Sequence, residues 1–120
     1  MAPTPDQLAL LDETKEVRMR TRSGDRAVDT IIWVVVPDGT VYVRSVRGET
    51  GRWYRRALAN PNVAIIVDGD EIEFEAVLVT ERAEIDAVSD ALRAKYRPGG
   101  SLDRMTSDEV LETTLRLDPV

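Results

Sequence analysis

The chain has 120 residues, of which 42% are hydrophobic and 32% are charged, and its net charge is −6 at pH 7. It contains no cysteine and no histidine, which excludes disulfides, the usual zinc sites, and Ser-His-Asp or Cys-His catalysis. The length predicts one domain, residues 1–120, around one hydrophobic core. The sequence holds neither an apolar run of membrane-spanning length nor a signal-like N-terminus, so we expect a cytoplasmic protein that does not bind membranes.

The charge is unevenly distributed along the chain. Residues 1–61 carry 10 basic and 8 acidic groups, whereas residues 62–120 carry 6 basic and 14 acidic groups. An acidic chain lacks the broad basic face that nucleic-acid binding requires, so we expect no nucleic-acid partner. A local basic pocket on an acidic body favours a small anionic ligand instead. Any chemistry must use carboxylate, Arg, Lys, Tyr or hydroxyl groups, or come from a bound cofactor.

The first third of the chain predicts a helix followed by three strands. Thr4-Pro5-Asp6-Gln7 is a capping box with proline at the first helical position, which predicts a short helix through Leu11. Residues 16–22 alternate as in a half-buried strand. Residues 30–36 form a continuous β-branched and aromatic run, which predicts a strand buried on both faces. After a Pro-Asp-Gly turn, residues 41–43 are expected to return as the partner strand of a hairpin.

The middle of the chain predicts two helices that flank a second hairpin. Residues 44–51 form a polar loop with two glycines, and residues 52–60 form a short helix that an Asn-Pro pair ends. Residues 63–67 and 71–79 are predicted strands joined by an Asp-Gly-Asp turn. Residues 81–96 place apolar side chains at helical spacing, which predicts a longer helix.

The last segment predicts a helical turn and a strand. Thr106-Ser107-Asp108-Glu109 matches a second capping box, and residues 113–117 are the sixth predicted strand. Tight turns between short strands favour antiparallel pairing, and closing such a sheet into a barrel removes its exposed edges. The predicted fold class is therefore α+β, mainly β, with a six-stranded antiparallel β-barrel and flanking helices.

The segment from Tyr42 to Arg56 is the strongest candidate for a binding site. It carries five arginines against one glutamate, and it runs from a strand through a loop into the start of a helix. Helix N-termini and guanidinium groups both bind phosphate, and glycines let the backbone approach a ligand closely. A solvent-exposed face that balances the acidic second half of the chain is an alternative of equal weight. The candidate ligands in this segment are Arg44, Ser45, Arg47, Gly48, Gly51 and Arg52.

Two further groups of side chains have a functional and a structural interpretation. Trp33, Trp53 and Tyr54 are candidates for stacking on a planar ring, but burial in the core is the favoured interpretation of both tryptophans. The acidic residues between Asp68 and Glu75 alternate on one strand, which favours a solvated face, so no metal site is predicted. The arginines of residues 18–22 are expected to face solvent or a dimer partner. No carboxylate pair is placed as acid and base, so the catalytic residues are unknown.

Several segments resemble the DUF2255 family of uncharacterised bacterial proteins. They are residues 30–35, 42–48, 51–55, 94–96 and 113–119. More distantly, the layout is similar to split barrels of the pyridoxamine-phosphate-oxidase type and to F420-dependent nitroreductases. The resemblance implies an FMN-binding split-barrel type of fold and a homodimer with cofactor sites at the subunit interface. It also implies that FMN or F420 is the cofactor, with Trp33 near the ring system and the phosphate held by Arg44, Ser45, Arg47 and the Gly48–Trp53 turn.

Three functions follow as hypotheses. The first is a flavin- or deazaflavin-dependent oxidoreductase in which the cofactor carries the hydride, and its substrate is not indicated. The second is a non-enzymatic cofactor carrier or small-anion-binding module on the same fold. The third is an interaction module whose arginines pair with the acidic face of a partner.

Overall fold

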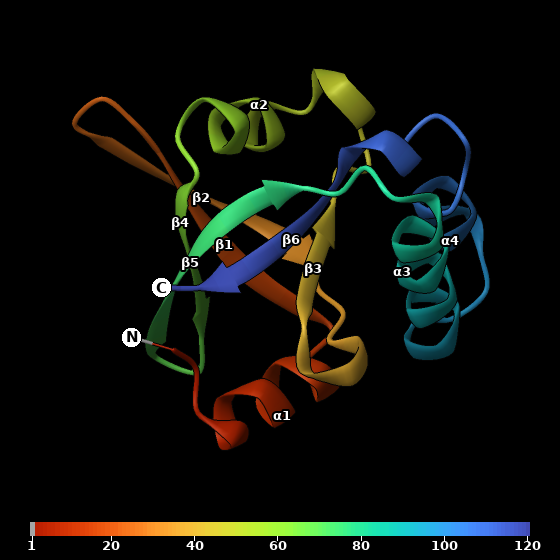
Figure 1. Ribbon diagram of the computed structural model, residues 1–120, viewed down its shortest axis with the longest axis horizontal. Coiled ribbons are helices and arrows are strands. Elements are labelled where there is room, and N and C mark those ends of the chain that lie inside the picture. Colours follow the sequence, from red (N-terminus) through yellow and green to blue (C-terminus); the bar gives the residue numbers. More distant parts are fainter. Residues whose placement is uncertain (1) are drawn as a thin grey trace.

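The computed structural model describes residues 2–120, which form six strands and four α-helices (Figure 1). No helix in this range is long and apolar enough to cross a membrane. The strands are β1 (Glu16–Ser23), β2 (Arg26–Trp33), β3 (Val41–Arg44), β4 (Asn62–Val67), β5 (Asp70–Leu78) and β6 (Thr114–Pro119). The helices are α1 (Pro5–Glu13), α2 (Arg52–Ala59), α3 (Arg82–Lys95) and α4 (Gly100–Met105).

All six strands belong to one antiparallel sheet with the order β2-β1-β4-β5-β6-β3. The sheet curls into a barrel that α1 covers at one end and α2 at the other, while α3 and α4 lie beside β3 (Figure 1). The end strands β2 and β3 are not paired with each other. A single bridge from Val35 to Tyr42, just beyond the end of β2, joins the two edges. The barrel is therefore split on this side.

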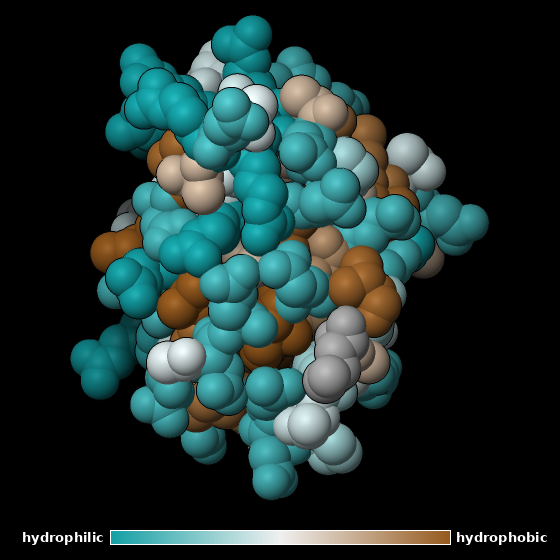
Figure 2. All heavy atoms as spheres, turned by 90° about the vertical axis from the view of Figure 1, so that its left-hand side faces the viewer, coloured by the Kyte–Doolittle hydropathy of each residue, from teal (hydrophilic) through white to brown (hydrophobic). Residues whose placement is uncertain are grey.

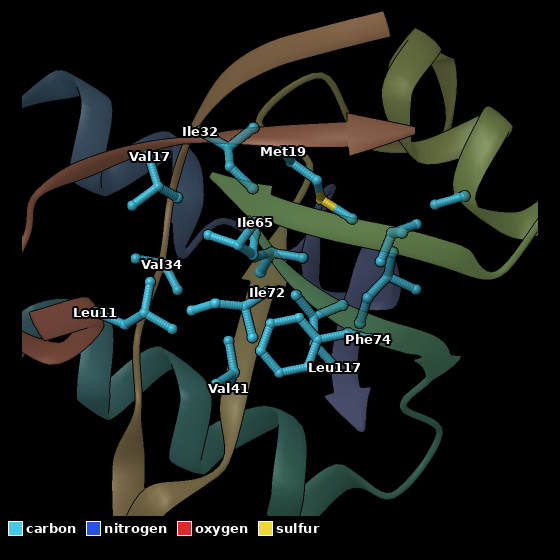
Figure 3. Packing of buried hydrophobic residues seen from close by; sticks show 14 of the residues in the cluster. Leu11, Val17, Met19, Ile32, Val34, Val41, Ile65, Ile72, Phe74 and Leu117 are labelled. Carbon is cyan, nitrogen blue, oxygen red and sulfur yellow. The ribbon is translucent and has the colours of Figure 1, made fainter. Parts of the chain in front are cut away.

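The barrel interior is filled by the apolar positions that alternate along the strands. On β1, Val17, Met19 and Thr21 are buried, which confirms the half-buried strand predicted from alternation. Figure 3 shows side chains from α1 and several strands meeting in this interior. They include Leu11, Val17, Met19, Val34, Val41, Ile65, Ile72, Phe74 and Leu117.

A second apolar cluster lies outside the barrel, under α3 and α4. It contains Val35 and Tyr42 from the barrel wall and Ile85, Leu92 and Met105 from the helices. The segment 34–36 serves both clusters, because Val34 and Val36 face the barrel interior whereas Val35 faces the helices. This alternation is the one expected of an extended segment between two apolar layers.

The predicted strand over residues 30–36, buried on both faces, is wrong. The strand β2 begins earlier and ends at Trp33, and it pairs only with β1, so it is an edge strand. Its Ile31 side chain is 66% exposed. The hairpin predicted for residues 41–43 also differs, because β3 pairs along its length with β6 and meets the preceding segment only at the Val35–Tyr42 bridge.

The prediction of a second capping box at residues 106–109 is also wrong. Thr106 follows the last residue of α4, and its hydroxyl donates to the carbonyl oxygens of Leu102 and Asp103. The helix α4 was not predicted, because Gly99, Gly100 and Ser101 at its start are poor helix formers. The helix forms where Leu102 and Met105 can enter the second cluster.

The remaining predicted elements are present, with ends shifted by a few residues. The capping box between Thr4 and Gln7 starts α1, with both of its hydrogen bonds formed. The helices α2 and α3, the β4–β5 hairpin and the last strand β6 lie where they were expected. The predicted six-stranded antiparallel barrel is confirmed.

Arginines of β1 and glutamates of β5 form one ion-pair network on the outside of the barrel. Arg20 forms an ion pair with Asp29 on the neighbouring strand β2. Arg20 and Arg22 also form ion pairs with Glu71 and Glu73 of β5, across the outer face of β4. The face on which the β1–β2 hairpin projects is largely hydrophilic, with scattered apolar patches (Figure 2). The solvated-face interpretation of the acidic row is therefore supported. Within residues 2–120, no group of three acidic side chains is close enough to hold a metal ion.

Tyr96 joins α3 to the barrel and to the segment after α1. Its buried hydroxyl donates to the carbonyl oxygen of Lys15 (2.6 Å) and accepts from the backbone N–H of Val34 (3.1 Å). Its ring stacks on Trp33, with 3.9 Å between the ring centroids and 4° between the planes. Burial of this hydroxyl raises its pKa to about 12, so it stays protonated at neutral pH.

We expect Tyr96→Phe to lower the free energy of unfolding by about 1–3 kcal/mol, because it leaves the buried N–H of Val34 without an acceptor. Urea denaturation monitored by far-UV circular dichroism measures this change. The control is Tyr54→Phe, since Tyr54 is comparably buried but its hydroxyl makes no hydrogen bond within residues 2–120 and is not among the buried unpaired atoms, so solvent reaches it. Equal destabilisation by the two variants would contradict the role assigned to the Tyr96 hydroxyl.

Candidate functional site

A cavity of about 580 Å³ lies between the edge strand β2, the loop after β3, the start of α2 and the helix α4. The split between β2 and β3 opens onto it, because residues on both edges form its walls. Its lining includes Val28, Thr30, Ile31, Ile32 and Trp33 from β2, Arg44 to Arg47 and Gly51 from the β3–α2 segment, Arg52, Trp53 and Arg56 from α2, and Ser101 and Met105 from α4.

The walls of the cavity are largely apolar and aromatic. Ile32 and Trp33 form the strand side, and Trp53 and Met105 lie on the helices. Tyr96 covers one face of Trp33, so Trp33 presents its remaining surface to the cavity. Trp53 is buried in the barrel core, as the sequence favoured, whereas Trp33 is only partly buried, which differs from the interpretation favoured for it. Stacking of either ring on a ligand stays a prediction. A planar aromatic ligand would find stacking partners here.

Four arginines line the cavity and give it a positive charge, and Arg44 is the buried one among them. Arg47 and Arg52 are exposed, and neither side chain makes an ion pair or hydrogen bond with any of residues 2–120. Arg56 lies one turn after Arg52, and its Nε donates to the hydroxyl of Thr21 at 2.7 Å. The helix α2 starts at this point with Gly51 as its N-cap, without a capping side chain or an acidic residue in its first turn. The first backbone N–H groups of α2 are thus free for an anion.

Arg44 lines the cavity but uses its guanidinium to hold the protein together. The side chain is 2% exposed. It donates to Thr114 Oγ1 (2.9 Å), to Ser89 Oγ (2.9 Å), and to the carbonyl oxygens of Met105 (2.9 Å) and Ile85 (3.0 Å). Burial lowers its pKa to about 10; nearby Arg93 adds to this effect and Asp86 opposes it. The prediction that Arg44 clamps a phosphate is therefore not supported, because most of the N–H groups of its guanidinium already donate to protein oxygens.

Ser45 and the two glycines also serve the loop itself. The hydroxyl of Ser45 donates to the carbonyl oxygen of Gly48 at 2.8 Å, so its proton is not free for a ligand. A Cβ at Gly51 would collide with Ser45 Oγ, and one at Gly48, where φ is +63°, would approach the carbonyl oxygen of Glu109 to 3.3 Å. The two glycines therefore make room for other atoms of the protein. The prediction was that they make room for a phosphate.

Comparison with known proteins places the chain in a family. The model of one family, described as an uncharacterized protein conserved in bacteria (DUF2255), matches residues 7–117. The chain belongs to the DUF2255 family. A comparison with curated proteins gave no significant match.

Solved structures resemble this DUF2255 chain over nearly its whole length. A Listeria innocua protein, provisionally named as a pyridoxamine 5'-phosphate oxidase, has a TM-score of 0.69 and 18% identity, with 93% of this chain and 89% of that one covered. The FAD binding protein from Mycobacterium smegmatis has a TM-score of 0.64 and 19% identity, with coverages of 100% and 92%. The heme storage protein HutZ from Vibrio cholerae has a TM-score of 0.71 and 17% identity, also with coverages of 100% and 92%. These similarities establish the split-barrel fold.

Most of the site residues predicted from the DUF2255 sequence lie together. Trp33, Arg44, Ser45, Arg47, Gly51, Arg52 and Trp53 all line the cavity, whereas Gly48 lines a neighbouring hollow with Glu109. Arg56, the last residue of the candidate segment, also lines the cavity. It was not among the predicted ligands, although its spacing of four residues from Arg52 on a predicted helix could have indicated it. Ser101 and Met105 also line the cavity. They were not predicted, because the glycines and serine at the start of α4 give no helical signal in the sequence.

We expect Arg44→Met to lower the free energy of unfolding by about 2–5 kcal/mol, because it leaves four buried oxygens without their donor. Arg52→Met is the matched control in the same segment. Its side chain is exposed and unpaired in the described part of the chain, so we expect a change within about 0.5 kcal/mol. Guanidinium chloride denaturation measures both values. A neutral or stabilising Arg44→Met would show that these hydrogen bonds do not hold the elements together.

Proposed function

We propose that the cavity binds the ring and phosphate of a flavin or deazaflavin cofactor, FMN or F420, and that the protein is an oxidoreductase using it. The observation that carries the proposal is the combination of an aromatic wall and unpaired arginines in one cavity at a helix start. A planar ring and a phosphate are the two groups that these walls complement. The names of similar split barrels, which include an FAD binding protein, support the same ligand class.

The phosphate would be held at the start of α2. Arg47 and Arg52 supply guanidinium groups that form no ion pair within residues 2–120. The free N–H groups of the first turn of α2 and the helix dipole add to the attraction for an anion. Arg44 contributes its buried charge to the local potential and supports the wall; its hydrogen bonds remain with the protein.

The ring would lie against Trp33 and Met105, with Trp53 on the α2 side. The bound cofactor would supply hydride transfer. The protein's contribution would be orientation and exclusion of water by the apolar walls. Glu16 is the one carboxylate among the lining residues described, and its exposed position gives it no evident role in proton transfer.

We further propose that a second copy of the chain covers the cavity. The strand β2 forms one wall of the cavity, and its outer edge has no partner strand within residues 2–120. Ile31, on this strand, lines the cavity and is 66% exposed. An unpaired strand edge with an exposed isoleucine next to an open cavity favours a homodimer interface.

A non-enzymatic cofactor carrier is the second candidate function. The observation that favours it is that Glu16, the one carboxylate among the lining residues described, is exposed to solvent and has no partner that would orient it for proton transfer. Both functions predict cofactor binding, and only the oxidoreductase predicts turnover. Anaerobic mixing of the loaded protein with an electron acceptor, after reduction of the cofactor, separates the two.

Fluorescence titration with FMN, FAD and F420 tests the proposed ligand class, and we expect binding of FMN or F420 at micromolar concentration. Arg47→Ala and Arg52→Ala should each weaken this binding about tenfold, because each removes a charge-assisted contact to phosphate. Arg55→Ala is the control, since Arg55 is exposed on the same helix but does not line the cavity. The proposal fails if none of the three cofactors binds, or if the Arg55 variant is affected as strongly as the other two.

A further inference from the structure

A second hollow adjoins the cavity on the far side of Arg47. It has a volume of about 470 Å³ and is lined by Val46, Arg47, Thr50 and Arg104. We call it the Arg104 hollow. Val46 and Arg47 line both spaces, so a ligand in the cavity could extend past Arg47 without leaving the protein surface.

Two arginines and no acidic residue are among the four residues that line the Arg104 hollow. Arg47 and Arg104 are both exposed, and neither side chain has an ion-pair or hydrogen-bond partner among residues 2–120. Other arginines, such as Arg20 and Arg116, are paired with acidic residues in this acidic chain. Unpaired guanidinium groups facing one hollow are therefore available to an anion.

Acidic residues limit where that anion can lie. Glu49, Asp108, Glu109 and Glu112 line a neighbouring hollow that also touches Arg47 and Arg104. These carboxylates would repel an anion from that side. The side lined by Thr50 and the two arginines has no carboxylate among its lining residues, and like the acidic hollow it shares Val46 and Arg47 with the cavity.

The helix α4 connects the two spaces mechanically. It presents Ser101 and Met105 to the cavity and Arg104 to the second hollow. The buried guanidinium of Arg44 holds the carbonyl oxygen of Met105 at 2.9 Å. Because Arg104 precedes Met105 directly, this hydrogen bond fixes the place on the protein surface from which Arg104 extends.

We propose that the Arg104 hollow is a second anion subsite and that the ligand is a flavin-type cofactor with more than one anionic group. The inference rests on the proposed function. FMN carries a single phosphate, which the arginines at the start of α2 would hold. FAD carries a diphosphate, and F420 carries a phosphodiester followed by carboxylates, so either one could place a second anion between Arg47 and Arg104.

The test compares the affinities of FMN, FAD and F420 for the full chain and for Arg104→Ala. We expect the unmodified chain to bind FAD or F420 more tightly than FMN. Arg104→Ala should weaken that tighter ligand about tenfold, because one charge-assisted contact is lost, and leave FMN within about twofold. Arg104→Lys should restore part of the loss. Which of FAD and F420 shows the effect identifies the source of the second anion.

Arg97→Ala is the matched control, because Arg97 is exposed and lines none of the hollows described. It removes the same charge and should change no affinity. The inference is overturned if Arg104→Ala weakens all three ligands equally, if it weakens none, or if Arg97→Ala has the same effect. Binding of FMN without such selectivity would overturn the second subsite alone, whereas absence of all binding would overturn the proposed function with it. Unchanged thermal midpoints confirm that both variants fold.

Discussion

The buried guanidinium of Arg44 holds together the part of the molecule in which the cavity lies. A cation that is 2% exposed needs an acceptor for nearly every N–H group, because an unpaired buried donor is costly. Arg44 meets this need with neutral oxygens from β6, α3 and the C-terminal end of α4. One side chain on β3 thereby sets the positions of three elements that are distant in the sequence.

The helix α4 depends most strongly on this arrangement. It has six residues, begins with glycine and has no capping side chain, so it has little intrinsic stability. Leu102 and Met105 anchor it in the second apolar cluster, and the hydrogen bond from Arg44 holds its last carbonyl group. Both the cavity wall and the Arg104 hollow follow from where α4 is placed.

The arginines of residues 44–56 have different tasks because they differ in burial. Arg44 is a structural cation, Arg56 is partly engaged by Thr21, and Arg47 and Arg52 remain available at the cavity. The loop between them keeps its shape through the hydrogen bond from Ser45 to Gly48 and the close approach of Ser45 to Gly51. An anion site here would thus consist of exposed guanidinium groups and a helix start on a loop with its own internal hydrogen bond.

The amino-acid sequence by itself determined the elements whose cause is local. Alternation predicted β1 and β5, a capping box predicted the start of α1, and the density of arginines predicted the segment that lines the cavity. Only the tertiary structure decided that β3 pairs with β6, that residues 30–36 leave the sheet at Trp33, and that α4 exists. It also decided which arginine is buried, because the oxygens that Arg44 binds lie 41 to 70 residues further along the chain. Periodicity and capping act over a few residues, whereas strand partners, buried charges and cavity walls depend on which distant segments meet.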